Sequence, residues 1–327
     1  MKRPYLTALV LLALGPTLPA HAQQPYPNRP IKVIVGYPAG GTLDGPARIV
    51  TQTMSRLAGQ SFVVENRPGA SANISAEIVA KAPADGYTLL LSSSSLSSSG
   101  ALFKNLPFEP TKDFRHVGRF CTLPTVIVAR KDLPANTLQE VVDLAKQNPG
   151  KLTYGSPGTG TGAHMSGEVL NRYAGIRITH IPFKGSAQAL TNISGGHIDL
   201  MIGGLSTIEG AIKGKLVKVL AVTNPEPSPD LVDAPTIQQA LKDYQAPRQY
   251  QFSTWLGLSA PAGTPDAVID RLQALLQAAL QDPKTRQELT AIGVSPGFLP
   301  GIALREQIDE EVPAYAKVVK EIGIAFD

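Results

Sequence analysis

Short apolar runs rich in β-branched residues alternate with helical patterns along most of this chain. A first series of runs covers residues 31–35, 62–65, 87–91 and 114–120, and apolar residues at helical spacing lie between them. A second series starts at 124 and continues through runs at 152–155, 178–183 and 198–204, then VKVLAVT. Such alternation is typical of α/β units, in which helices cover a parallel sheet. The pattern predicts two α/β units of similar size.

The C-terminal part predicts one more strand, STWLGLSAP, and helices over 267–280 and 303–322. One strand and two helices do not make a third domain, so we expect them to return to the first unit. The chain would then cross between domains near Phe120–Thr125 and again near Pro247–Thr254. Two crossing strands act as a hinge. We therefore predict two doubly wound α/β domains, one from residues 23–122 plus 248–327 and the other from 123–247, with a ligand cleft between them.

The N-terminus has the pattern of a secretory signal peptide. Lys2 and Arg3 precede an apolar run over 6–14, and Ala20-His21-Ala22 supplies small residues for cleavage. The run is too short to span a bilayer as a mature helix. We predict a signal peptide over residues 1–22, the alternative being an N-terminal helix that stays in the fold.

The cysteine content indicates the cellular compartment, and the charge limits the classes of partner. Cys121 is the only cysteine, so the chain forms no internal disulfide, which for an exported protein fits a bacterial periplasm. Without Lys2 and Arg3 the 30 basic residues become 28, against 26 acidic ones. Nucleic-acid binding needs clusters of Lys and Arg, and the sequence contains no such cluster. No nucleic-acid partner is therefore expected.

The segment IKVIVGYPAGGTLD, from Ile31 to Asp44, ends a strand on a Pro/Gly turn that opens directly into a helix. Such a turn directs unpaired backbone N–H groups at one point, as an anion site requires. The alternative is a plain strand-to-helix turn. Asp44 would repel an anion, so we expect it to cap the helix or to order the loop through water. The candidate ligand-binding residues are Tyr37, Gly40, Gly41, Thr42 and Asp44.

A second strand–glycine–helix segment, LTYGSPGTGTGAH, runs from Leu152 to His164. Its G-x-G-x-G spacing, without a ribose-binding acid about 20 residues later, does not match a dinucleotide site, and no Lys follows the last glycine as a P-loop needs. What remains is a general anion cradle at a helix start. The candidates are Gly158, Thr159, Gly160, Thr161 and His164, although such a His is more often a surface or capping residue.

Other segments follow strands at the edge where ligands of open α/β sheets bind. The serines that begin at Ser92 come after one strand, with a flexible low-complexity loop as the alternative. By the same rule the segments Phe183–Gly185 and Gly203–Leu205 border the cleft. The additional candidates are Ser92, Ser93, Ser94, Phe183, Gly203, Gly204 and Leu205.

The sequence contains no motif of a known enzyme active site. It contains no G-x-S-x-G and no H-E-x-x-H motif, and its histidines lack metal-ligand spacing. Lys184 could be a catalytic amine if buried, but a ligand-loop or salt-bridging cation is the better interpretation. We predict no catalytic residue, no metal and no cofactor. A hydrolase that uses the same cleft and a ligand sensor for a receptor remain alternatives.

Several motifs together carry a resemblance to a known family: YPAGGTLDGPAR, VVENRPGASANI, KAPADGYTLLL, LPFEPTKDF, IPFKGSAQALTNISGGHIDLM, KVLAVT and APAGTP. In this order the chain resembles the Bug-type solute-binding proteins of tripartite tricarboxylate transporters. The resemblance implies a type II periplasmic-binding-protein fold that closes on a small organic acid. It also implies delivery to the large and small membrane subunits of a permease, by a protein that we expect to be monomeric.

The resemblance also implies roles for the candidate residues. Backbone amides and ordered waters of Tyr37–Asp44 would hold one carboxylate, Gly158–Thr161 with His164 would hold the other end, and Ser92–Ser94 would add hydroxyls. The chain departs from the family pattern in two places. Gly203 and Gly204 stand where many relatives place Asp or Asn, and only serines follow the third strand. We expect both to widen the cleft. No acid is then present to pair a ligand ammonium, so an amino acid would bury an unpaired charge. Two helix-start cradles that face each other across one cleft favour a dicarboxylate over a monocarboxylate, and aromatic versus aliphatic stays open.

Overall fold

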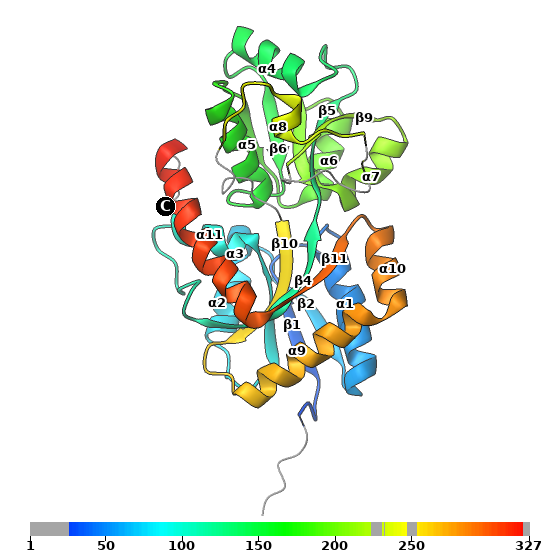
Figure 1. Ribbon diagram of the computed structural model, residues 1–327, viewed down its shortest axis with the longest axis vertical. Helices are drawn as coiled ribbons and strands as arrows, with labels where there is room; N and C mark the ends of the chain where they lie inside the picture. The colour runs from blue at the N-terminus through cyan, green and yellow to red at the C-terminus, as the bar shows by residue number, and fades with distance from the viewer. Residues whose placement is uncertain (1–25, 224–230, 232, 247–253, 323–327) are drawn as a thin grey trace, which may run out of the picture.

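The computed structural model describes residues 26–223, 231, 233–246 and 254–322. Two β-sheets, each with helices on both faces, form two domains that face each other end to end (Figure 1). The predicted signal peptide, residues 1–22, and residues 247–253 of the predicted second crossing lie outside the described residues. The predicted domain boundaries stay predictions. Within the described residues, no helix combines the length and the apolar character needed to cross a bilayer.

The first domain is built on a six-stranded sheet in the order β11-β4-β10-β3-β1-β2. Its strands are β1 (Ile31–Val35), β2 (Phe62–Asn66), β3 (Thr88–Ser93), β4 (Phe114–Leu123), β10 (Thr254–Pro261) and β11 (Ser295–Pro300). β10 pairs with β3 and β4, which confirms that the C-terminal strand returns to the first unit. β11, which pairs with β4, was not predicted.

Helices cover both faces of this sheet. One face carries α1 (Asp44–Ala58), α9 (Asp266–Gln281) and α10 (Pro283–Ala291), and the other carries α2 (Asn73–Ala80), α3 (Ser94–Leu102) and α11 (Gly301–Ile322) (Figure 1). Ile269, Leu272, Leu276 and Ala279 are buried at helical spacing along α9. Each such Leu or Ile side chain contributes about 1.5–3 kcal/mol by leaving water. This packing fixes the platform from which the cleft-facing loops extend.

The second domain is a smaller version of the same design. Its sheet has the order β7-β6-β8-β5-β9, and α4, α5 and α8 pack on one face while α6 and α7 pack on the other. The strands are β5 (Thr125–Arg130), β6 (Thr153–Ser156), β7 (Thr179–Pro182), β8 (Leu200–Gly204) and β9 (Val217–Val222). The helices are α4 (Leu138–Gln147), α5 (Gly162–Tyr173), α6 (Ser186–Ser194), α7 (Leu205–Lys213) and α8 (Ile237–Ala240).

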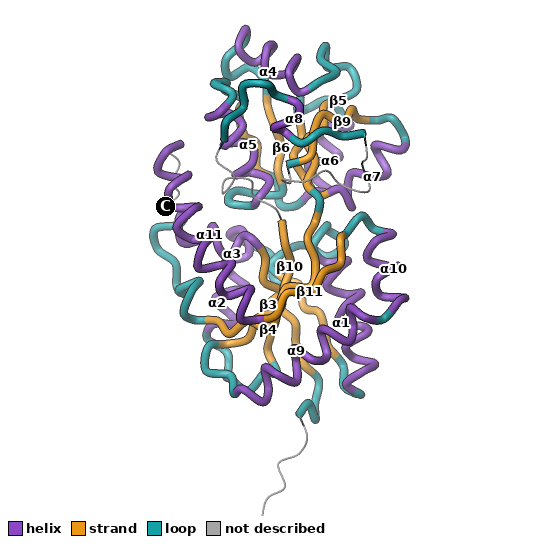
Figure 2. Tube along the Cα trace, viewed as in Figure 1, coloured by secondary structure: helices purple, strands orange, loops and turns teal. Residues whose placement is uncertain are grey.

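Both sheets are mixed, although the strand–helix alternation predicted parallel sheets. β1, β2 and β3 are parallel, as are β6, β7 and β8, but β10 is antiparallel to β3 and β5 is antiparallel to β8. The reason is the crossing: β5 and β10 begin at the cleft, so they must run away from it. β4 and β10 lie side by side near the cleft, with Leu123 opposite Thr254 (Figure 2).

An apolar cluster also joins the two domains beside the cleft. It contains Leu102 of α3, Met165 and Val169 of α5, and Tyr315 and Val318 of α11. The C-terminal half of α11 therefore packs against the second domain as well as the first.

Candidate functional site

A cavity of about 300 Å³, here called the inner cavity, lies between the two domains. Five helices begin at its wall: α1 and α3 from the first domain, and α5, α6 and α7 from the second. The first turn of a helix has N–H groups without an intrahelical partner and the positive end of the helix dipole. Helix starts from both sides therefore give this cavity a positive field that suits an anion.

Most of these helix starts lack a side-chain cap. No side chain accepts a capping hydrogen bond at the start of α1, α3, α6 or α7 in the described part of the chain, whereas Thr161 caps α5 by accepting the His164 N–H. Backbone carbonyls accept some of these N–H groups: the Asp44 and Gly45 N–H groups donate to the Gly41 carbonyl, and the Leu205 N–H donates to the Pro124 carbonyl. A helix-start N–H without such a partner bonds to water or to a ligand.

The side chains of the inner cavity add little charge of their own. Among the described residues that line it, Lys184 is the only one charged at neutral pH, and no carboxylate is present. A ligand with an ammonium group would therefore have no acidic partner on this wall.

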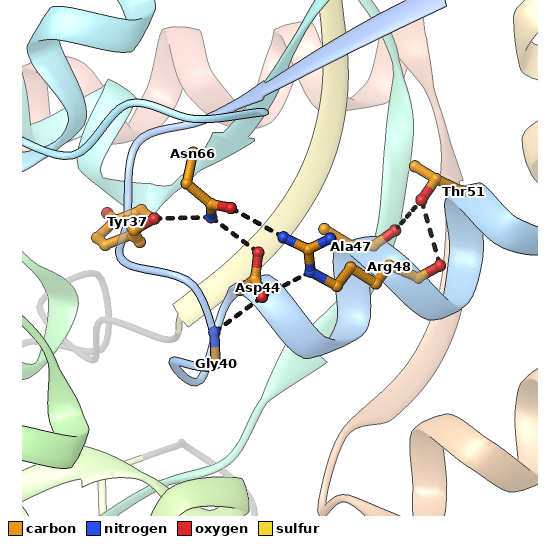
Figure 3. Close-up of polar contacts among 7 residues, drawn as sticks. All are labelled: Tyr37, Gly40, Asp44, Ala47, Arg48, Thr51 and Asn66. Atoms are coloured by element: carbon orange, nitrogen blue, oxygen red, sulfur yellow. Dashed lines mark hydrogen bonds and ion pairs between the residues drawn. The ribbon is translucent and has the colours of Figure 1, made fainter. Parts of the chain in front are cut away.

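Asp44 orders the first loop through hydrogen bonds to Gly40, Arg48 and Asn66 (Figure 3). Its Oδ2 accepts hydrogen bonds from the Gly40 N–H at 2.9 Å and from Arg48 Nε at 2.8 Å, and its Oδ1 accepts from Asn66 Nδ2 at 2.8 Å. Burial acts to raise the pKa of Asp44, but these hydrogen bonds outweigh it and hold that pKa below its ordinary value. The carboxylate is therefore ionised at neutral pH and neutralised by Arg48.

The predicted capping role of Asp44 is wrong. Leu43 occupies the N-cap position of α1, and Asp44 is the first helical residue. Asp44 holds the loop by direct hydrogen bonds, one of which it accepts from the Gly40 N–H. The φ of Gly40 is 74°, in the left-handed region that glycine favours. The Gly40 N–H therefore bonds to protein in this structure.

The serine segment is ordered and largely buried, so its interpretation as a flexible loop is wrong. Ser93 ends β3 and Ser94 begins α3. The Tyr37 hydroxyl bonds to Ser95 Oγ at 2.7 Å and to Ser93 Oγ at 3.3 Å, and burial raises the Tyr37 pKa. The polar serines are tolerated at this depth because their hydroxyls bond to Tyr37, to the Ser95 carbonyl and to Ser259.

Two stacked histidines support the second glycine loop. His164 Nδ1 accepts the Gly160 N–H at 3.1 Å, and the rings of His164 and His180 lie 4.1 Å apart. His180 Nε2 bonds to Ser156 Oγ at 2.7 Å. Burial lowers the pKa of His164 to about 3 and that of His180 to about 4, so both are neutral near pH 7. Their packing fixes the shape of the loop.

The candidate residues from the sequence fall into three groups. The inner cavity is lined by Tyr37, Gly40, Gly41, Thr42, Ser93, Ser94, Thr161 and Gly204. A neighbouring cavity of about 780 Å³, here called the outer cavity, is lined by Gly158, Thr159 and Phe183. Neither cavity is lined by Asp44, Ser92, Gly160, His164, Gly203 or Leu205.

The expectation that Gly203 and Gly204 widen the cleft is wrong. A Cβ on Gly203 would lie 2.8 Å from Met201 Cε, inside the domain core. A Cβ on Gly204 would lie 2.5 Å from Cγ2 of Thr42, which belongs to the other domain. Gly204 thus permits close approach of the two domains, and Thr42 fills the space that a side chain would take.

Hydroxyl groups connect the domains across the cleft. Thr42 Oγ1 bonds to Thr207 Oγ1, the Ser71 hydroxyl donates to the Thr159 carbonyl, and the Ser98 hydroxyl donates to the Gly160 carbonyl. Each bond joins a first-domain residue to the second domain, so the structure has the two domains in direct contact around the cavity.

Gly185, expected at the cleft edge, lines the inner cavity, but the first turn of α6 was not predicted as part of the site. Ser186, Ala187 and Gln188 line the inner cavity, as do Ser95, Gly162 and Ala163. The signal was available in IPFKGSAQ, which repeats the order of strand, glycine and helix found in the other two loops.

Comparison with known proteins identifies a family model and solved structures that are similar to this chain. A family model described as "Tripartite tricarboxylate transporter family receptor" matches residues 46–324. The structure of the periplasmic binding protein BugD is 33% identical, with a TM-score of 0.84 over 92% of this chain and 99% of that one.

Two similar structures contain organic acids. Rpa4515 of R. palustris, with adipate, is 31% identical with a TM-score of 0.85 and covers 92% of this chain and 99% of its own. MatC from Rhodopseudomonas palustris, with bound malate, is 29% identical with a TM-score of 0.81 and covers 90% of this chain and 100% of its own.

Proposed function

Because the chain belongs to the tripartite tricarboxylate transporter receptor family, whose members are periplasmic binding proteins and not enzymes, we propose that it captures a small dicarboxylate between its domains. It then delivers this ligand to the large and small membrane subunits of a tripartite tricarboxylate-type transporter. Family membership sets aside the hydrolase alternative.

The single observation that carries the proposal is the convergence of five helix starts on one cavity without a carboxylate in its described wall. α1 and α3 approach from one domain and α5, α6 and α7 from the other. A diacid can therefore place one carboxylate at each set of helix starts. The presence of adipate in Rpa4515 and of malate in MatC supports the same ligand class.

In the proposed site, the loop from Tyr37 to Leu43 and the serines at the start of α3 hold one carboxylate. The first turns of α5 and α6 hold the other. Asp44 and His164 act as positioning residues, because each fixes a glycine loop through a backbone amide without lining the cavity. Gly203 and Leu205 lie behind the wall.

We further propose that residues 1–22 direct export to the periplasm and that the mature protein is a monomer. Mass spectrometry of protein secreted by a bacterial host would give the mature N-terminus, expected at Gln23. Light scattering would give the mass.

A thermal-shift screen followed by calorimetry tests the ligand class. Adipate is compared with hexanoate, which keeps the chain length but has one carboxylate, and with glutamate, a diacid one carbon shorter that carries an ammonium. A ligand at one hundred times its Kd stabilises the native state by about 2.7 kcal/mol, which is easily seen as a shift in Tm. We expect adipate to bind most tightly of the three. Equal binding of hexanoate, or tightest binding of glutamate, would contradict the proposal.

A further inference from the structure

The outer cavity adjoins the inner one and differs from it in chemistry. The two share Tyr37, Pro38, Pro157, Lys184 and Gln188 as lining residues, so they are continuous. The first domain contributes the loop of residues 68–72 and Phe103, and the second contributes Pro157–Thr159 and the segment 182–184.

The walls of the outer cavity are mainly rigid and apolar. Four prolines and two phenylalanine rings line it: Pro38, Pro68, Pro157, Pro182, Phe103 and Phe183. Proline has no N–H to donate, so these positions give a ligand apolar surface and no hydrogen bonds. Such a wall suits the apolar body of a ligand, because apolar and aromatic groups gain by leaving water.

Lys184 is the charged group between the two cavities. It is exposed, it lines both, and no carboxylate of the described residues forms an ion pair with it. An ammonium without a partner at a cavity mouth attracts a second ligand carboxylate.

The outer cavity is also held in shape from both domains. Ala70, Ser71 and Ala72 have φ values of 45°, 55° and 75°, which side-chain-bearing residues adopt rarely and at an energetic cost. The Ser71 hydroxyl donates to the Thr159 carbonyl, so this strained turn is tied to the opposite domain. Residues of both domains therefore shape this wall in the closed arrangement.

We propose that the outer cavity is a second subsite, which takes the apolar or aromatic body of an extended dicarboxylate while Lys184 pairs with its distal carboxylate. The first carboxylate remains at the starts of α1 and α3 in the inner cavity, so this inference rests on the proposed function. In a diacid too long for the inner cavity, the second carboxylate meets Lys184 in place of the first turns of α5 and α6. A second subsite of this kind favours diacids that are longer than succinate or aromatic.

The test is calorimetry with benzene-1,4-dicarboxylate, benzoate, adipate and succinate on the full mature protein. Wild type should bind benzene-1,4-dicarboxylate at least tenfold more tightly than benzoate. Lys184→Ala should weaken benzene-1,4-dicarboxylate three- to tenfold and Lys184→Glu more, with less than a twofold change for benzoate. Phe103→Leu, which keeps apolar volume, should weaken the aromatic diacid and leave succinate unchanged.

Lys151→Ala is the matched control, since Lys151 is exposed on the same domain and lines neither cavity. Equal effects of Lys184→Ala on diacid and monoacid, no effect on either, or failure of benzene-1,4-dicarboxylate to bind while adipate binds would overturn the second subsite alone. If none of the acids binds wild type, the proposed function itself fails.

Discussion

Gly204 offers a direct way to perturb the contact between the domains. Adding a methyl group in Gly204→Ala places its Cβ 2.5 Å from Thr42 Cγ2, whereas ordinary van der Waals contact begins near 3.4 Å. The domains must then separate or Thr42 must rotate and lose its bond to Thr207. The φ of Gly204 is −65°, so the substitution introduces no backbone strain of its own.

The structure sets the size of the effect. Overpacking of this kind costs about 1–3 kcal/mol, and here it acts only where the domains touch, because the two residues belong to different domains. A penalty of about 1–3 kcal/mol on the closed state corresponds to binding that is roughly 5- to 150-fold weaker. Thr42→Ser removes Cγ2 and keeps the hydroxyl. The nearest atom to the new Cβ is then Thr42 Cβ at 3.6 Å, so the double variant should regain most of the affinity.

Calorimetry with adipate gives the affinities, and small-angle scattering gives the radius of gyration with and without ligand. Gly210→Ala in α7 is the matched control, because no atom lies within 4 Å of its added Cβ. Wild-type affinity in Gly204→Ala would refute the closed contact as part of the bound state. If Thr42→Ser fails to restore binding, Gly204 acts by contact with the ligand and not by domain approach.

Three further outcomes follow from the same structure. Asp44→Ala removes an acceptor shared by Gly40, Arg48 and Asn66, and because Arg48 is half exposed we expect an unfolding free energy lower by only about 2–4 kcal/mol in chemical denaturation, with ligand affinity reduced at least tenfold. An unchanged midpoint would contradict this account. The folded-state pKa of Asp44 lies below its ordinary 3.8, so the stability difference between wild type and Asp44→Ala should be complete above about pH 5 and shrink as pH falls through the folded-state pKa. A difference that grows on acidification would reverse the assigned sign. Cys121 is fully buried and burial raises its thiol pKa, so Ellman's reagent should label the unfolded but not the native protein. Rapid labelling of the native state would show that the first core opens.

Some parts of the site could be predicted because they depend on local patterns. The run Ile31–Val35 and the periodic apolar residues of α9 specify a strand and a helix with little outside information. The glycines at 40 and 158 mark the turns between strand and helix, where positive φ values are found. Fold class and the first cavity-lining loop could therefore be inferred from the sequence.

Other parts depend on segments that are distant along the chain. The sequence does not show that Asp44 bonds to Asn66, which lies on the neighbouring strand, or that His164 stacks on His180. Both carboxylate and imidazole were candidates for ligand contact, and tertiary packing assigned them to support loops. The direction of β10 likewise follows from the crossing between domains and not from its own residues.

Gly203 and Gly204 show what the sequence determines and what only the tertiary structure decides. Their place in the sequence determined that two residues without side chains end a buried strand. Only the tertiary structure decided that Gly203 faces Met201 in the core while Gly204 faces Thr42 of the other domain. The physical reason is that alternate residues of a strand point to opposite faces. Gly203 shares a face with Met201 of the same strand, whereas Thr42, which Gly204 faces, belongs to a segment far away in the chain.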